Sequence, residues 1–535
     1  RPCVRNWDPV CQQTAAMGDL MANGTTGLTI NTVFIVSMAA CAGIGVWGVV
    51  DPDGMTGAAL GFTNYALTGV SWAWLALCTG FLFLALFMAF GPYGHVRLGK
   101  DDEEPEFSTA SWIAMLFAGG MGSGLLVWGA AEPMYHWQGP PGIEGGTAEA
   151  ARHALVITNL HWGFHAWAIY ACCALVIAYF TFRRNESSMI STPIRALFQG
   201  STGVAVGKAA DILAVMSVVF GLAGSLAMGV LAVRNGMGFA FDTAQTSTNS
   251  MIILGILFVC YMLSATTGVD KGIKILSNLN MVVAVAIMLW VLFAGPTRFL
   301  LETFIDSIGS YFSGMITMSF KLFPFEDLGG WTAGWTLTYL IWWLAWGPFI
   351  GIFVARISRG RTIREFVIGV VFVPTIFSML WFAVFGGAGF YIEMFGGGGL
   401  KEIIFEDAMK ALFAFLGFFP GAEILTVLAV ILLFIFLVTS ADSGTFVLSM
   451  MTTDGNLNPP VMQKMIWGSL IAILTIGTVA SESVSVAKAM AITGAIPFAV
   501  IVMLQIVGFL REIRKETPPL RPIEARGEAV GAARD

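Results

Sequence analysis

A run of glycines between residues 119 and 124 is the first part of this sequence that could bind a ligand. They stand in the stretch AGGMGSGLLVWGAAEP as Gly119, Gly120, Gly122 and Gly124. Each glycine costs a regular helix about 1 kcal/mol relative to alanine, so we expect the helix to break here. Inside a membrane, irregular backbone is stable only beside a cavity or packed protein, where its free N–H groups can bind an anionic group. Tight helix packing through small residues explains the run equally well, and both interpretations stay open.

Aromatic residues gather in two apolar stretches, LHWGFHAWAIY and TLTYLIWWLAWGPF. Six of these residues are candidates for a cation site, namely Trp162, Trp167, Tyr170, Trp342, Trp343 and Trp346. In one continuous helix Trp162 and Tyr170 lie about 80° apart, so two or three rings of the first stretch can face one cavity. A quaternary ammonium or sulfonium group has no N–H donors and binds to ring faces, at about 0.5–2 kcal/mol per ring. Ordinary aromatic packing is the alternative, although tryptophans near mid-span are hard to explain as an interfacial belt.

Polar side chains inside apolar stretches need a partner or a function, and four of them stand out. His161 and His165 have the i, i+4 spacing of a metal pair, but the sequence shows no third ligand near them. We therefore expect both to pack or to form hydrogen bonds. Glu132 and Asp442 are costly within a membrane and indicate a function or a buried partner. For Glu132, in the sequence AAEP, we expect helix capping beside the broken segment.

Composition predicts that membrane-spanning helices position these residues. Of 535 residues, 56% are hydrophobic and 12% are charged, whereas soluble domains carry about 25% charged residues. A soluble enzyme of this size is therefore not expected. The net charge of -6 gives no basic face for nucleic acid.

Twelve apolar runs are long enough to cross a bilayer, which takes about 20 residues of helix. They cover residues 31–50, 72–91, 109–135, 153–181, 209–233, 251–267, 276–294, 333–354, 366–386, 422–450, 464–480 and 488–510. Residues 297–320 and 399–416 are each predicted to form an amphipathic helix at the membrane interface.

The distribution of basic residues predicts the orientation. With both termini on one side, 21 of the 28 lysines and arginines fall on that side, which the positive-inside rule assigns to the cytoplasm. We predict a multi-pass protein of the cell (inner) membrane. It has a cytoplasmic segment at 1–30, a transmembrane domain at 31–511 and a short cytoplasmic tail at 512–535.

Four stretches carry a resemblance to a known family. RLGKDDEEPEFSTASWIAMLFAGGMGSGLLVWGAAEP (97–133), WWLAWGPFIGIFVARISRGRTIREF (342–366) and VTSADS (438–443), together with the HWxxxxWAIY stretch, resemble the betaine/choline/carnitine transporter (BCCT) family. The similarity runs in order from about residue 31 to 511. It implies an all-α membrane protein of twelve transmembrane helices. In this fold helices 3–7 and 8–12 form a LeuT-type five-plus-five inverted repeat, beside two peripheral N-terminal helices. The resemblance also implies a homotrimer.

The resemblance assigns a substrate site. The family's aromatic box is matched by Trp162, Trp167, Tyr170 and Trp343, and neighbouring tryptophans of the cytoplasmic pathway are matched by Trp342 and Trp346. The backbone at Gly120, Met121, Gly122 and Gly124 is expected to meet the substrate's carboxylate. In proton-coupled choline carriers of the family the position of Gly124 looks to be Asp, so glycine favours a zwitterion such as glycine betaine or dimethylsulfoniopropionate.

The resemblance also implies a coupling ion, and no resident cofactor. Sodium-driven members hold Na⁺ with oxygens that correspond to Ala118, Met121, Thr439 and Ser440. A second sodium site in some members uses threonines, which align with Val218 and Leu222 here, so that site is doubtful. Spans 3 and 10 contain no Lys or Arg that would replace the ion.

We therefore predict a sodium-coupled secondary transporter, not an enzyme, whose partners are a small onium substrate and the lipid bilayer. The alternatives within the class are an ion-independent substrate/product exchanger and a proton-coupled choline or carnitine carrier. An intramembrane enzyme or receptor is a different class, in which His161, His165 and Asp442 would have to assemble one site. Residues 511–535 hold six basic and five acidic groups. Osmosensing members have strongly basic tails, so we expect little osmotic regulation.

Overall fold

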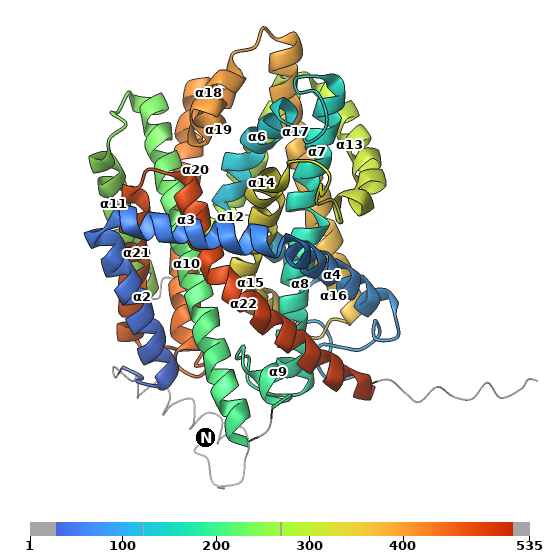
Figure 1. Ribbon diagram of the computed structural model, residues 1–535, viewed down its shortest axis with the longest axis vertical. Coiled ribbons are helices and arrows are strands. Elements are labelled where there is room, and N and C mark those ends of the chain that lie inside the picture. Colours follow the sequence, from blue (N-terminus) through green and yellow to red (C-terminus); the bar gives the residue numbers. More distant parts are fainter. Residues whose placement is uncertain (1–27, 121, 199, 268–269, 517–535) are drawn as a thin grey trace, which may run out of the picture.

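Helices make up the regular structure of the computed structural model (Figure 1), which describes residues 28–120, 122–198, 200–267 and 270–516. Within these ranges eleven helical segments are long and apolar enough to cross a membrane, and no strand occurs beyond an isolated β-bridge. The segments are α2 (Thr32–Val50), α4 (Ser71–Phe90), Ala148–Arg183, α10 (Gly200–Phe241), α11 (Ser247–Thr267), Leu276–Ala294 of α12 (Asp270–Ala294), Gly329–Ile357, Ile363–Phe395, α20 (Ala422–Met451), α21 (Val461–Ala480) and Val484–Glu516, which contains α22 (Val484–Ile513). An all-α, multi-pass membrane protein is therefore confirmed.

The predicted helix break in the third run is confirmed. That run forms two helices, α5 (Thr109–Gly120) and α6 (Ser123–Gln138). Gly122 caps the start of α6 with an extended backbone, at φ -110° and ψ -162°. All twelve predicted runs are helical, but the count of twelve membrane-spanning helices stays a prediction. The inverted repeat stays a prediction.

The fourth run is also divided, which the sequence did not predict. It forms α7 (Ala148–Trp162) and α8 (Phe164–Ala178), and continues in a short π-helix to Arg183. Gly163 between them has φ -101° and ψ -130°, and a Cβ there would lie 2.4 Å from the Asn159 carbonyl oxygen. The angle expected between Trp162 and Tyr170 assumed one continuous helix, and that assumption is wrong because glycine permits a break between them.

Two further segments differ from expectation. Residues 52–69, which lie between two predicted spans and had no predicted element, form α3 (Pro52–Gly69). This helix begins with a proline after the N-cap Asp51 and lies across other helices in Figure 1. Residues 399–416, predicted as one interfacial helix, form α18 (Leu400–Glu406), a 3-10 turn and α19 (Ala411–Leu416). Asp407 interrupts the helix with an extended backbone, and every residue of α19 is buried. The other predicted amphipathic segment is a single helix, α13 (Thr297–Met318).

The two most extensive helix–helix contacts of the core involve α10 and α15. Helix α10 packs against α22, and α15 (Thr338–Ile357) packs against α8. Where α10 meets α22, a Cβ on Gly224 would lie 2.3 Å from the Ala487 carbonyl oxygen. Only glycine allows this approach, so backbone contacts backbone at this point.

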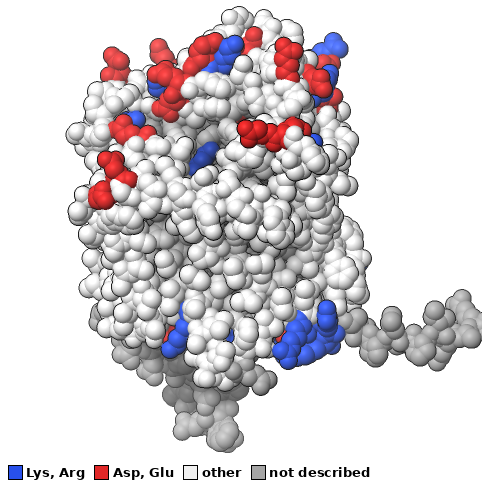
Figure 2. All heavy atoms as spheres, in the orientation of Figure 1, with Lys and Arg blue, Asp and Glu red and all other residues white. Residues whose placement is uncertain are grey.

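Charged side chains gather at the two ends of the molecule and leave a white band between them (Figure 2). The lower end in this view shows mainly lysine and arginine, whereas the upper end shows many acidic groups. This pattern is the one expected of a protein whose middle faces lipid. Which end faces the cytoplasm stays a prediction.

Candidate functional site

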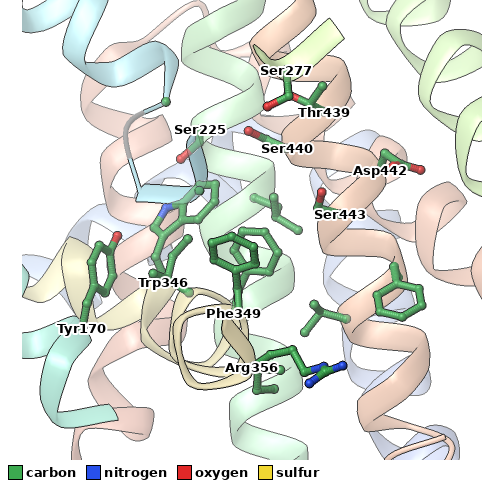
Figure 3. Close-up of a pocket in the computed structure, with 18 of the residues that line it drawn as sticks. Tyr170, Ser225, Ser277, Trp346, Phe349, Arg356, Thr439, Ser440, Asp442 and Ser443 are labelled. Atoms are coloured by element: carbon green, nitrogen blue, oxygen red, sulfur yellow. The ribbon is translucent and has the colours of Figure 1, made fainter. Parts of the chain in front are cut away.

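A cavity of about 1260 Å³ lies where the broken third helix faces α8, α10, α15 and α20. We call it the central cavity. Among the predicted site residues it is lined by Gly122, Gly124, Trp162, Tyr170, Trp342, Trp343, Trp346, Thr439 and Ser440. In Figure 3, Tyr170 and Trp346 lie on one side of this space, and Thr439 and Ser440 lie on the helix opposite. The structure thus brings together the glycine run, both aromatic stretches and the VTSADS stretch.

Two rings of the central cavity, those of Trp162 and Tyr170, each stand nearly perpendicular to the Trp343 ring. The ring centroids of Trp162 and Trp343 are 5.1 Å apart with an interplanar angle of 80°, and those of Tyr170 and Trp343 are 5.6 Å apart at 88°. Such rings can present faces to one bound cation. Trp167 does not line the cavity. It packs behind Tyr170, with centroids 5.8 Å apart.

The backbone at the helix break lies next to these rings. A Cβ on Gly124 would come within 3.3 Å of the Trp162 ring, so any larger residue would have to displace the indole. Gly122 and Gly124 line the cavity with backbone atoms, while Gly120 is the last residue of α5. Met121 lies outside the described residues. An anionic group beside Gly122 would face the N-terminus of α6, where unpaired N–H groups favour negative charge.

Glu132 positions the Trp162 indole and joins it to His161, a role that the sequence did not predict. It is fully buried in the interior of α6 and does not cap a helix, so the capping expectation is wrong. Its Oε2 accepts a hydrogen bond of 2.6 Å from the Trp162 indole N–H, and its Oε1 lies 2.6 Å from His161 Nδ1. The backbone carbonyl of His161 in turn accepts a hydrogen bond of 2.7 Å from the Trp343 indole N–H. One buried carboxylate and one histidine therefore fix two walls of the cavity.

His161 and His165 have separate environments, as expected for residues that pack and form hydrogen bonds. His165 Nε2 lies 3.0 Å from the Ser319 hydroxyl, whereas His161 joins Glu132 and the Thr336 hydroxyl. His161 does have two metal-type neighbours: one ligand atom each from Glu132, His136 and His161 lie within 4.8 Å of one another. The Glu132-to-His136 spacing of four residues was the signal in the sequence. Because Glu132 and His161 already share hydrogen bonds with the aromatic walls, we interpret the cluster as part of that network.

Hydroxyl groups on α20 face the same cavity. Thr439 and Ser440 line it, and the Thr439 hydroxyl donates to the carbonyl oxygen of Ile435 at 3.1 Å. On α10, Val218 and Leu222 are buried and aliphatic, which leaves no hydroxyl at the positions of a second sodium site. Ala118 lies in the last turn of α5.

A second pocket of about 820 Å³ lies at the other end of α15. Trp128 lines both this pocket and the central cavity. The second pocket is lined by Trp335, which lies just before α15 in the continuous helical segment Gly329–Ile357, here called the α15 segment. The central cavity is lined near the opposite end of α15 by Arg356, which lies at the lower edge of the cavity in Figure 3. The two spaces therefore lie end to end through the bundle.

Comparisons with known proteins agree with this architecture. A family model described as BCCT, betaine/carnitine/choline family transporter, matches residues 32–518. The chain is 38% identical to the glycine betaine transporter OpuD of Bacillus subtilis (strain 168) over 92% of this chain and 96% of that protein. It is 36% identical to the ectoine/hydroxyectoine transporter of Virgibacillus pantothenticus, over 91% of this chain and 97% of the relative. It is 34% identical to the glycine betaine transporter of Acinetobacter baylyi (strain ATCC 33305 / BD413 / ADP1), over 94% of this chain and 75% of the relative.

Proposed function

The chain belongs to the betaine/carnitine/choline transporter family, and we propose that it imports a zwitterionic onium compound by sodium-driven alternating access. The substrate class is glycine betaine or a close analogue, including the sulfonium compound dimethylsulfoniopropionate. One observation carries the proposal: the rings of Trp162, Tyr170 and Trp343 line the same cavity as the glycine helix break, with Trp343 nearly perpendicular to each of the other two.

The chemistry of the cavity supports this substrate class. Methylated onium groups have no donors to satisfy, so ring faces replace their hydration. The carboxylate of a zwitterion would face the backbone at Gly122 and Gly124, where the N-terminus of α6 favours an anion. Choline has no carboxylate for this end of the cavity. A zwitterion therefore fits both ends.

The coupling ion is argued from the oxygens of α20. The Thr439 and Ser440 hydroxyls line the cavity, and Na⁺ binds hard oxygen ligands. The Ala118 and Met121 backbone would complete the site across the helix break. This supports sodium over substrate/product exchange without an ion, since we find no lysine or arginine on α20 or on α5 and α6.

We further propose that the protein is a homotrimer in the cell membrane with both termini in the cytoplasm. The basic lower end in Figure 2 supports that orientation by the positive-inside rule.

Substrate binding and transport are tested together. The purified protein is titrated with glycine betaine, choline, carnitine, dimethylsulfoniopropionate and ectoine by isothermal calorimetry, and labelled glycine betaine uptake is measured in proteoliposomes with and without a sodium gradient. We expect a zwitterion to bind tightest and sodium to drive its accumulation. Trp343→Ala should lose binding by tenfold or more, at about 0.5–2 kcal/mol per ring plus lost positioning. Trp47→Ala removes an exposed indole on α2 and should bind normally. Equal uptake with and without sodium would overturn the coupling, and unchanged binding by Trp343→Ala would overturn the site.

A further inference from the structure

The ammonium group of Lys488 lies over three aromatic rings. Its nitrogen is 4.2 Å from the ring centroid of Trp128, 4.9 Å from that of Trp335 and 5.4 Å from that of Tyr339. All three distances are within the roughly 6 Å at which a cation is attracted to a ring face. We call Trp128, Trp335 and Tyr339 the ring cage. It belongs to α6 and the α15 segment, whereas Lys488 belongs to α22.

The ring cage is the close partner of this cation. Within the described ranges, the Lys488 ammonium group has no hydrogen-bond or salt-bridge partner. It lines the second pocket, where carboxylates also occur. Those carboxylates are bound elsewhere: Glu482 to Arg234 at 3.2 Å, Asp407 to Asn235 at 2.8 Å and Glu406 to Lys410 at 2.8 Å. The rings are therefore the close contacts of Lys488, and the buried Glu132 carboxylate adds an electrostatic attraction.

The ring cage forms part of the wall between the two spaces. Trp128 lines both of them, Trp335 lines the second pocket, and Tyr339 lines the central cavity. The Lys488 side chain reaches this wall from α22, which packs along α10. The ammonium group therefore connects α22 to α6 and α15 at the place where the two spaces would have to join.

We propose that Lys488 is a gate residue: its ammonium group, bound in the ring cage, stabilises the form in which the central cavity is closed to the second pocket. This inference rests on the proposed function, because alternating access requires that wall to open in each cycle. Opening must separate α22 from α6 or α15 and so withdraw the cation from the rings. Any interaction present only in the closed form shifts the equilibrium toward it.

The gate also contacts the substrate site through one shared ring. Tyr339 stacks on the imidazole of His161, with centroids 4.9 Å apart and an interplanar angle of 10°. His161 in turn joins Glu132 and Trp343. A shift of Tyr339 on gate opening would therefore displace His161 and, through it, the aromatic walls of the central cavity.

The test measures the width of the second pocket by double electron–electron resonance. Spin labels are attached to Asp327→Cys, before the α15 segment, and Ser485→Cys, on α22, in a chain with Cys3, Cys11 and Cys260 replaced by alanine. Both label sites are exposed. Lys488→Met removes the charge and keeps the length, Lys488→Arg keeps the cation, and Trp335→Leu weakens the ring cage from the other side. Lys401→Met is the matched control, because it removes a partly exposed lysine of α18 that pairs with Glu402 at 3.8 Å.

We expect the ratio of longer to shorter label distances to rise by about tenfold in Lys488→Met and in Trp335→Leu. In Lys488→Arg and Lys401→Met the ratio should equal that of the parent. Parent-like distances in Lys488→Met, or the same shift in Lys488→Arg, would overturn the gate. If Lys488→Met does not fold, Trp335→Leu against Lys401→Met decides the same question. Glycine betaine titration of the parent tests the proposed function separately: its failure contradicts the substrate assignment, whereas a shift in label distance would still support the gate.

Discussion

The indole N–H of Trp162 donates a hydrogen bond of 2.6 Å to Glu132, a fully buried carboxylate one helix away. The other oxygen of the same carboxylate lies 2.6 Å from His161. A hydrogen bond to a charged group contributes about 1.5–3 kcal/mol, more than one between neutral groups. The orientation of an aromatic wall in the central cavity therefore depends on a residue that does not line the cavity.

Removing that carboxylate should weaken substrate binding without touching the substrate. In Glu132→Leu the Trp162 N–H loses its partner, and an unpaired buried donor costs about 1–3 kcal/mol. We expect glycine betaine affinity to fall by about tenfold in calorimetry and the protein to melt at a lower temperature. Glu132→Gln keeps an acceptor for one N–H, so its affinity and melting temperature should lie between those of the parent and of Glu132→Leu. An affinity equal to the parent in Glu132→Leu would show that Trp162 is held by packing alone.

Trp343 combines a ring face with a hydrogen bond, and two variants separate them. Trp343→Phe keeps an aromatic face but removes the N–H that bonds to the His161 carbonyl at 2.7 Å. We expect a loss of about 0.5–1.5 kcal/mol for a neutral hydrogen bond, so affinity should fall a few-fold in Trp343→Phe and much further in Trp343→Ala. The two variants binding equally would mean that the ring face contributes nothing.

The closeness of Gly124 to Trp162 should set the size of the onium group. A methyl group at Gly124 would lie 3.3 Å from the indole, which is tighter than an ordinary contact. We expect Gly124→Ala to push the indole into the cavity and weaken trimethylammonium substrates more than the smaller dimethylsulfonium substrate. Affinities of glycine betaine and dimethylsulfoniopropionate, measured by tryptophan fluorescence quenching, check this. A uniform loss for both would argue for general disruption instead.

Sodium dependence should require the hydroxyls of α20. Thr439→Ala and Ser440→Ala each remove one oxygen of the proposed sodium site, so the sodium concentration for half-maximal uptake should rise several-fold, and the double variant should lose sodium stimulation. Ser443→Ala, on the same wall of the cavity (Figure 3), is the control and should keep it. Uptake assays in proteoliposomes over a range of sodium concentrations measure the effect. Normal stimulation of the double variant would place the ion elsewhere.

The sequence predicted the apolar spans well because a membrane span requires a long uninterrupted apolar run. Helix α3 was not predicted, because Pro52–Gly69 contains glycine, threonine and asparagine among its apolar residues and so does not form an uninterrupted apolar run. The break at Gly122 was predictable from four nearby glycines. The break at Gly163 was not, because a single glycine inside an apolar run usually stays helical and only the backbone angles of the structure reveal the change.

The aromatic walls were predicted, but their supports were not. Ring type and spacing indicate which residues can face a cation, so Trp162, Tyr170 and Trp343 could be found in the sequence. Trp167 has the same type and spacing, yet it packs behind Tyr170. The bonds from Glu132 to Trp162 and His161 join separate helices, and spacing along one helix does not predict a partner on another.

The contact of Gly224 with Ala487 links the packing of α10 against α22 to the proposed gate, although neither residue lines the central cavity. Ala487 directly precedes Lys488, so a single methyl group added at Gly224 would move the lysine relative to its rings. Variants with altered transport rate but unchanged substrate preference should therefore be sought among small residues on buried helix faces. A random-mutagenesis screen confined to the cavity walls would miss them.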